Sequence, residues 1–177
     1  MAIQTIQFAK AVLDRNEAIL FAALDGLDAD ELARQPGPDS NPIGWLMWHL
    51  TRVQDNHLSA MEESEHVWLR DRWHERFGRG DDASDRGRGH TSDEVRDFRS
   101  PGVDVLLGYY KAVRGRTDAF LETVSDEDLD RQVPNVTGDG TVPMRVRLEM
   151  TLVDNIQHSG QIAYLRGLLK GKGWFAS

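Results

Sequence analysis

The stretch DNIQHSGQIAYLRG, residues 154–167, places a carboxylate and an imidazole one turn apart in a predicted helix. Asp154 and His158 are four residues apart, so their side chains lie on the same face of that helix. Burying either group is costly unless the two pair with each other or bind something else. The stretch therefore predicts either a paired core histidine or one wall of a binding site.

Three further segments also show the spacing of apolar residues that is typical of helices. The four helices are expected to span about residues 3–24, 42–61, 101–124 and 146–169. Asn41 and Ser100 are expected to cap the second and third helices, and Pro42 and Pro101 to be their first helical residues, because proline fits that position well. The fourth is expected to end at glycine just after Lys170.

Two short acidic segments resemble each other, LDADELARQP (27–36) and VSDEDLDRQVP (124–134). Each lies between a long helix and a helix that carries a histidine. The chain is therefore predicted to form two helix pairs, each joined by a short capped helical turn, in an all-α four-helix bundle. A single domain over residues 1–177 is expected, with TGDGTV (137–142) as a small hairpin or a plain loop.

A long loop is predicted between the second and third helices, over residues 76–95. Glycine and charged residues dominate this segment, and its apolar residues show no periodicity. A loop of that length in a compact domain is disordered or functional, so it is interpreted as a lid over a site or as a solvated surface loop. His90 is expected to be exposed, and Thr91-Ser92-Asp93-Glu94 to cap a short helix.

Composition excludes several classes of protein. The formal net charge is −8, with 29 acidic and 21 basic residues, which argues against a nucleic-acid-binding surface. The absence of cysteine excludes disulfides, thiolate zinc sites and a cysteine nucleophile. No signal peptide and no apolar run of about 20 residues is present, so a cytoplasmic protein that does not enter membranes is expected.

His49, in the second helix, completes a candidate metal site with Asp154 and His158. Two imidazoles and one carboxylate are sufficient for a catalytic zinc site with an open fourth position, and the same ligands suit iron or nickel. The alternative is a structural Asp–His pair, with His49 satisfied elsewhere in the core.

Three more residues are candidates for the walls of this site. His57 lies two turns beyond His49 and about 80° around the helix, so it lines the pocket or faces solvent. Gln161 is a candidate hydrogen-bond partner for a metal ligand, or a packing residue. Arg166 either receives a carboxylate or phosphate, or faces solvent at the helix end.

NPIGWLMWHLTRVQDNHL (41–58) and DNIQHSGQIAYLRGLL (154–169) resemble the two metal-bearing helices of the DinB-like superfamily. The His-x-Gly-Gln motif followed by Leu-Arg-Gly is characteristic of that family. GHTSDEV (89–95) and LLGYY (106–110) are similar to one actinobacterial branch, the mycothiol S-transferases. The resemblance covers the chain from about residue 11 to residue 174.

The resemblance implies a divalent metal, zinc in the first instance, between the second and fourth helices. Most members of the family use three histidines, one from the second helix and two from an H-x-x-x-H motif on the fourth. Carried onto this chain, the ligands are His49 and His158, and the middle position falls on Asp154. Aspartate also ligates zinc, so the site is expected to form with one positive charge fewer than the family pattern.

The resemblance also implies a reaction, the joining of a low-molecular-weight thiol, mycothiol, to an electrophile at a metal that favours the thiolate. On this interpretation Trp45 contacts an apolar electrophile, and Arg166 and the long loop hold the polar part of the thiol. Two alternatives are a thiol-dependent isomerase of the maleylpyruvate type and a metal-binding or small-molecule-binding stress protein without activity. A homodimer is expected.

Overall fold

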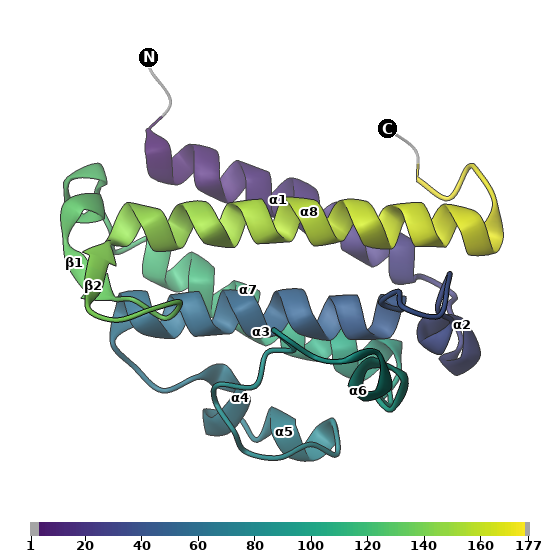
Figure 1. Cartoon of the computed structure of the whole chain (residues 1–177). Coiled ribbons are helices and arrows are strands. Elements are labelled where there is room, and N and C mark those ends of the chain that lie inside the picture. Colours follow the sequence, from purple (N-terminus) through teal and green to yellow (C-terminus); the bar gives the residue numbers. More distant parts are fainter. Residues whose placement is uncertain (1–3, 176–177) are drawn as a thin grey trace.

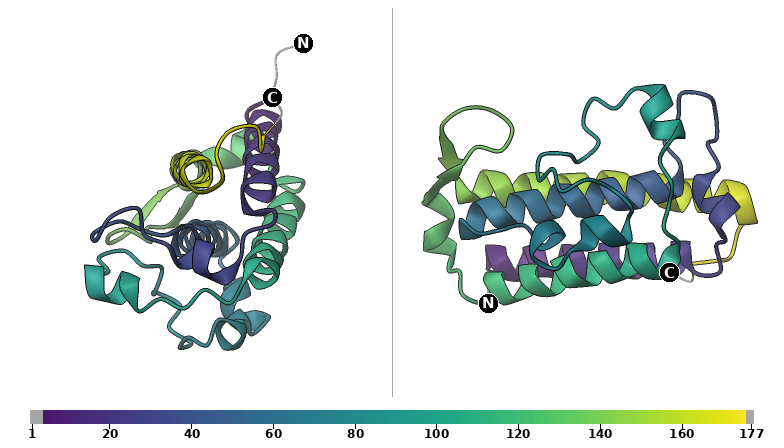
Figure 2. Two further views of the ribbon diagram at one scale, coloured as in Figure 1. Left: turned by 90° about the vertical axis from the view of Figure 1, so that its right-hand side faces the viewer. Right: turned by 90° about the horizontal axis from the view of Figure 1, so that it is seen from below.

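The computed structural model describes residues 4–175 and is almost entirely helical (Figure 1). Its four long helices are α1 (Thr5–Leu24), α3 (Ile43–Glu62), α7 (Val103–Leu121) and α8 (Met144–Lys170). Helix α8 packs between α1 and α3, and α7 contacts the same two helices from the other side (Figure 2). The predicted all-α four-helix bundle is confirmed.

Short elements connect the long helices. They are α2 (Ala29–Ala33), α4 (Val67–Arg70), α5 (Trp73–Arg76), α6 (Ser92–Arg96), the 3-10 helix η1 (Asp126–Asp130), β1 (Gln132–Pro134) and β2 (Thr141–Pro143). The two acidic segments that resemble each other become α2 and η1, and each begins with a reciprocal capping box. Helix α6 begins with the same device, formed by Thr91 and Glu94 as expected.

The helix starts differ from the predicted ones by one to two residues. Pro42 is the cap of α3 and not its first helical residue. Helix α7 begins after Gly102, whose φ of 99° lies in the region that only glycine adopts easily, and not at Pro101. Helix α8 begins at Met144 because β2 leads directly into it.

The expected hairpin forms just before α8. Strands β1 and β2 pair antiparallel, with Val133 opposite Val142, so the turn occupies most of the TGDGTV segment. The amide of Met144 donates to the carbonyl of Arg131 at 2.8 Å, which fixes the first turn of α8 against the hairpin. The hairpin closes the end of the bundle opposite α2 (Figure 1).

The core consists of two apolar clusters. One surrounds Trp48 and Trp68 and includes apolar residues from each of α4 to α7, and the other surrounds Leu13 and Met61 near the hairpin. Over residues 4–175, no helix has the length and apolar character that crossing a bilayer requires.

A band of buried polar side chains fixes α8 against the other helices. Asn155 donates to Gln54 of α3 at 3.3 Å, and Gln54 donates to Thr117 of α7 at 3.0 Å. Ser159 of α8 donates to Asn16 of α1 at 3.2 Å. Buried polar groups must find their partners, so these contacts set the longitudinal position of α8, and with it the neighbouring residue Asp154.

Candidate metal centre

Three side chains from two helices converge on one point of the bundle. His49 projects from α3, and Asp154 and His158 project from α8. Their side chains are only 13%, 19% and 16% exposed, so water competes weakly for them. One candidate ligand atom from each residue lies within 4.8 Å of the other two. The structure thus brings together the three residues that the sequence singled out.

The spacing of these atoms differs from that of a hydrogen-bonded Asp–His pair. Asp154 Oδ1 lies 3.5 Å from His158 Nε2 and 3.9 Å from His49 Nε2. A charge-assisted hydrogen bond would bring such atoms to about 2.8 Å. Ligand atoms about 2.0–2.1 Å from a tetrahedral zinc ion lie roughly 3.3–3.4 Å from one another. The observed separations are nearer to the second value, with space for an ion between the atoms.

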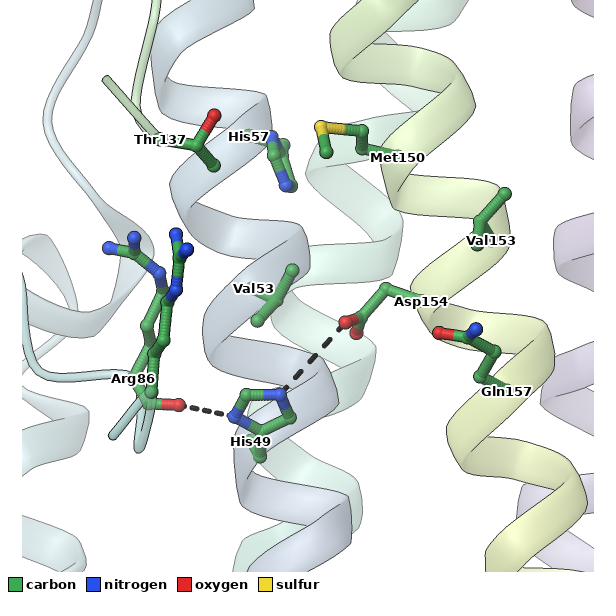
Figure 3. Close-up of a pocket in the computed structure, with 10 residues that line it drawn as sticks. His49, Val53, His57, Arg86, Thr137, Met150, Val153, Asp154 and Gln157 are labelled. Carbon is green, nitrogen blue, oxygen red and sulfur yellow. Dashed lines mark hydrogen bonds and ion pairs between the residues drawn. The ribbon is translucent and has the colours of Figure 1, made fainter. Parts of the chain in front are cut away.

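Hydrogen bonds at the far sides of the rings orient both histidines. His49 Nδ1 donates to the carbonyl of Arg86, and His158 Nδ1 donates to Gln161 Oε1 at 2.7 Å. In the neutral form of each ring, the Nδ1–H tautomer leaves Nε2 as a lone pair that faces Asp154, as Figure 3 shows for His49. This is the arrangement that metal-binding histidines use.

The environment acts on the two imidazoles in opposite directions. Burial lowers the pKa of His49, and Asp154 only partly offsets this effect. Burial also acts to lower the pKa of His158, but its contacts with Asp154 and Gln161 outweigh burial and raise that pKa above its ordinary value. Neutral His49 suits a metal ligand, and His158 must release its proton before it can bind an ion.

One buried oxygen of the site lacks a partner. Asp154 Oδ2 is inaccessible to water and has no hydrogen-bond donor among residues 4–175. A buried carboxylate oxygen without a donor is costly, and a cation would satisfy it. The donor set therefore fits a divalent metal held by two imidazole nitrogens and one carboxylate.

A pocket of about 260 Å³ opens beside His49 and Asp154 (Figure 3). Its middle is apolar, and its far end is polar and basic. The lining residues are His49, Val53, His57, Arg86, Arg88, Thr137, Met150, Val153, Asp154 and Gln157. His57 lines this pocket, which is one of the two positions that the sequence allowed; the other was a solvent-facing one.

Comparison with known proteins places the chain in a family. The model of the DinB superfamily matches residues 13–162. This chain belongs to the DinB superfamily. The crystal structure of a conserved protein from Enterococcus faecalis is similar, with a TM-score of 0.84 and 29% identity over 97% of this chain and 100% of that one. No match was found among curated proteins.

In this DinB-superfamily protein the loop over residues 83–90 packs against α3. Arg52 is fully buried and donates to the carbonyls of Asp85, at 3.0 Å, and Ala83, at 2.7 Å. These bonds pin the backbone that presents the Arg86 carbonyl to His49. The backbone of this part of the loop is therefore packed, because a buried guanidinium needs acceptors and finds them there, while the side chains of Ser84 and Arg88 remain exposed.

His90 is also not the exposed residue that was expected. It stacks on Trp48 with 5.8 Å between ring centroids, accepts a hydrogen bond from Trp45 Nε1 at 3.2 Å, and faces Asp85 at 3.2 Å. Trp45 in turn stacks on His49 with 4.8 Å between centroids. His90 thus contacts Trp45, and Trp45 holds His49. The spacing of these residues in the sequence did not indicate this chain of contacts.

Trp45 and Arg166 take positions other than a pocket wall. Trp45 is 5% exposed and packs on the face of His49, so it positions the imidazole. Arg166 is half-buried near α2, where its charge adds to the larger effects of Lys170 and the Asp28 amide in lowering the pKa of Glu31. Gln161 does contact a candidate ligand, as its spacing suggested.

Proposed function

We propose that this protein is a metal-dependent thiol S-transferase that joins a low-molecular-weight thiol, mycothiol in the first instance, to an electrophile. One observation carries the proposal. The three-residue site supplies three ligand atoms beside a pocket that leaves room for a substrate. Sites with three protein ligands and an open position are typical of catalytic metal centres.

His49, Asp154 and His158 are the proposed ligands of a divalent metal, with zinc expected first and nickel or iron as alternatives. Such an ion, when bound, lowers the pKa of a thiol that reaches it and favours the reactive thiolate. One aspartate among the ligands leaves the centre with one net positive charge. The protein has no cysteine, so the nucleophilic sulfur comes from the thiol substrate.

The chain's own residues hold the geometry for this reaction. Arg86 and Gln161 hold the two rings so that their Nε2 atoms would face a bound ion, and the apolar Val53, Met150 and Val153 line the adjoining pocket. In the proposed step the thiol sulfur forms a bond to the electrophilic carbon, and the bond from that carbon to its leaving group breaks. The leaving group departs with the electron pair, and the thiol proton passes to water.

The experiment is a conjugation assay on zinc-loaded protein. Mycothiol, glutathione and cysteine are each offered with a fluorogenic alkyl halide. We expect mycothiol conjugation above the uncatalysed rate and its loss in His49→Ala, with the exposed Arg99→Gln variant retaining full activity. Thermal melting of each variant checks that the fold is kept. A wild-type protein that binds zinc but conjugates none of the thiols contradicts the transferase and favours a metal-binding protein without this activity.

A further inference from the structure

The pocket beside the metal centre has two chemically different ends. His49 and Asp154 form one end, and His57, Thr137 and the guanidinium of Arg86 lie at the other (Figure 3). Arg86 connects the two ends, because its carbonyl binds His49 while its side chain extends toward Thr137. The proposed transfer reaction uses only the first end.

The second end holds positive charge without a matching carboxylate. Among residues 4–175, the side chain of Arg86 donates only to backbone carbonyls, those of Val136 at 3.2 Å and Ser84 at 3.5 Å. Burial lowers the pKa of Arg86, and the neighbouring charges of Arg88 and Arg52 lower it further. Arg88 also lines the pocket, lies close enough to Arg86 to lower its pKa, and is exposed. This concentration of positive charge occurs in a protein whose net charge is −8.

A third arginine lies behind this end of the pocket. Arg147 of α8 is 2% exposed and donates to Asn135 Oδ1 at 3.2 Å. Its Nε is buried and has no acceptor among residues 4–175, and burial alone accounts for the lowering of its pKa. A buried guanidinium without a counterion is costly, so Arg147 adds an uncompensated positive charge behind His57.

His57 presents a neutral N–H donor between Arg147 and the pocket. Arg147 Nη1 lies 3.5 Å from His57 Nδ1, and a guanidinium can only donate, so Nδ1 is the acceptor and the proton of His57 is on Nε2. Burial, followed by the charge of Arg147, lowers the pKa of His57 to about 4. At neutral pH the ring is therefore an uncharged donor and adds no further positive charge to that of the arginines.

We propose that Arg86, Arg88 and His57 form an anion subsite, backed by Arg147, which holds an oxyanion group of the substrate at the end of the pocket away from the metal centre. The group is a carboxylate, sulfonate or phosphate, since arginine forks and N–H donors match these oxygens. Val53, Met150 and Val153 separate the two ends, so the substrate carries an apolar segment between its reacting atom and its anionic group. This substrate class rests on the proposed function, but binding at the subsite does not require the metal.

The test compares benzoate with benzamide, two probes of nearly equal shape that differ in charge. Their binding is measured by isothermal titration calorimetry on the full chain, once after treatment with a chelator and once after loading with zinc. We expect benzoate to bind at least about tenfold more tightly than benzamide in both preparations. The preference should decrease as sodium chloride is added, because salt screens the arginines near solvent.

Variants separate the subsite from the metal centre. Arg86→Gln should weaken benzoate about tenfold, and Arg88→Gln about threefold because Arg88 is exposed. Benzamide binding should change little in either variant. Arg86→Lys keeps the charge and should recover part of the loss, and the exposed Arg99→Gln serves as the matched control with wild-type affinity.

Three results have distinct meanings. Equal affinity for benzoate and benzamide in the wild type overturns the inference. Benzoate binding that needs zinc and is unchanged in Arg88→Gln and Arg86→Gln also overturns it, because the carboxylate then binds at the ion. Charge-dependent binding that disappears in the arginine variants, in a protein that takes up no zinc, supports the subsite and contradicts the proposed metal-dependent function.

Discussion

His49 and His158 face the same carboxylate but are oriented by different parts of the chain. His158 donates to Gln161, three residues later on the same helix. His49 donates to the carbonyl of Arg86, which lies 37 residues away in the loop between α5 and α6. One half of the site is thus built within α8, and the other half depends on how the loop packs against α3.

The two halves also differ in how many tertiary contacts hold each histidine in place. Gln161 is an exposed side chain that needs nothing beyond helical geometry. The loop needs the buried Arg52, the stacked His90 and the close approach of Gly87 to Trp45 before one carbonyl reaches His49. The site is therefore expected to tolerate changes near Gln161 better than changes in the loop.

The largest effect should come from removing a ligand on either side of this comparison. His49→Ala and His158→Ala should each lower zinc affinity by more than the roughly 100-fold that outer-shell changes cost. Competition with a chromogenic chelator measures both affinities. Wild-type affinity in either variant would show that the ring in question is not a ligand, however well it is oriented.

A smaller effect is expected from one methyl group in the loop. A Cβ on Gly87 would lie 2.5 Å from Trp45 and 2.9 Å from Trp48, at a φ of +83°. Gly87→Ala should therefore lower the free energy of unfolding by about 3 kcal/mol and weaken zinc binding through the displaced Arg86 carbonyl. Urea denaturation and chelator competition measure the two effects.

Gly89→Ala is the matched control for this loop variant. Gly89 has nearly the same φ, +84°, but its Cβ would meet nothing within 4 Å. Gly89→Ala should therefore lower the free energy of unfolding only by the backbone strain, about 1 kcal/mol, and leave zinc binding unchanged. Equal effects of the two substitutions would contradict the role of the loop in holding His49.

His57, which lines the pocket with His49, provides a pH test. Its pKa is lowered from 6.5 to about 4 by burial and then by Arg147, so the unfolded chain binds its proton at a higher pH than the folded chain does. Folding stability from this group is present above pH 6.5 and is lost as the pH falls toward 4. Between pH 7 and 5 the wild type should lose about 2 kcal/mol more than His57→Gln, measured by urea denaturation at each pH. Parallel profiles would show that His57 is not held neutral.

The smallest effect should follow from the local support of His158. Gln161→Leu removes the acceptor of His158 Nδ1 and should weaken zinc about tenfold, with the melting temperature unchanged because Gln161 is exposed. Gln157→Leu, one turn earlier on α8, should leave the affinity within about twofold. A loss in Gln161→Leu as large as that in Gly87→Ala would remove the distinction between the two halves.

The sequence could predict the half of the site that lies within α8, but not the loop contacts that hold His49. Asp154, His158 and Gln161 share one helix, so their spacing alone places them together. His49 follows from the periodicity of α3, and the capping boxes of α2, η1 and α6 follow from acidic residues at fixed offsets.

The loop contacts could not be predicted in this way. The support of His49 by the Arg86 carbonyl depends on backbone direction, which no residue type at position 86 encodes. The burial of His90 depends on Trp45 and Trp48, more than 40 residues earlier. A lone histidine among glycines and charges has the pattern of an exposed residue, and only the packed loop shows otherwise.

The central claim, that Asp154 joins the two histidines in holding a metal ion, is tested most directly by elemental mass spectrometry. Untagged wild-type protein and Asp154→Asn are supplied with zinc, nickel and iron, separated from free metal, and analysed for bound metal. We expect close to one divalent ion per chain in the wild type and a large loss in Asp154→Asn, with both proteins folded by circular dichroism. Wild-type protein that retains no metal, or equal metal content in the two proteins, would contradict the claim and leave Asp154 as a structural partner of the histidines.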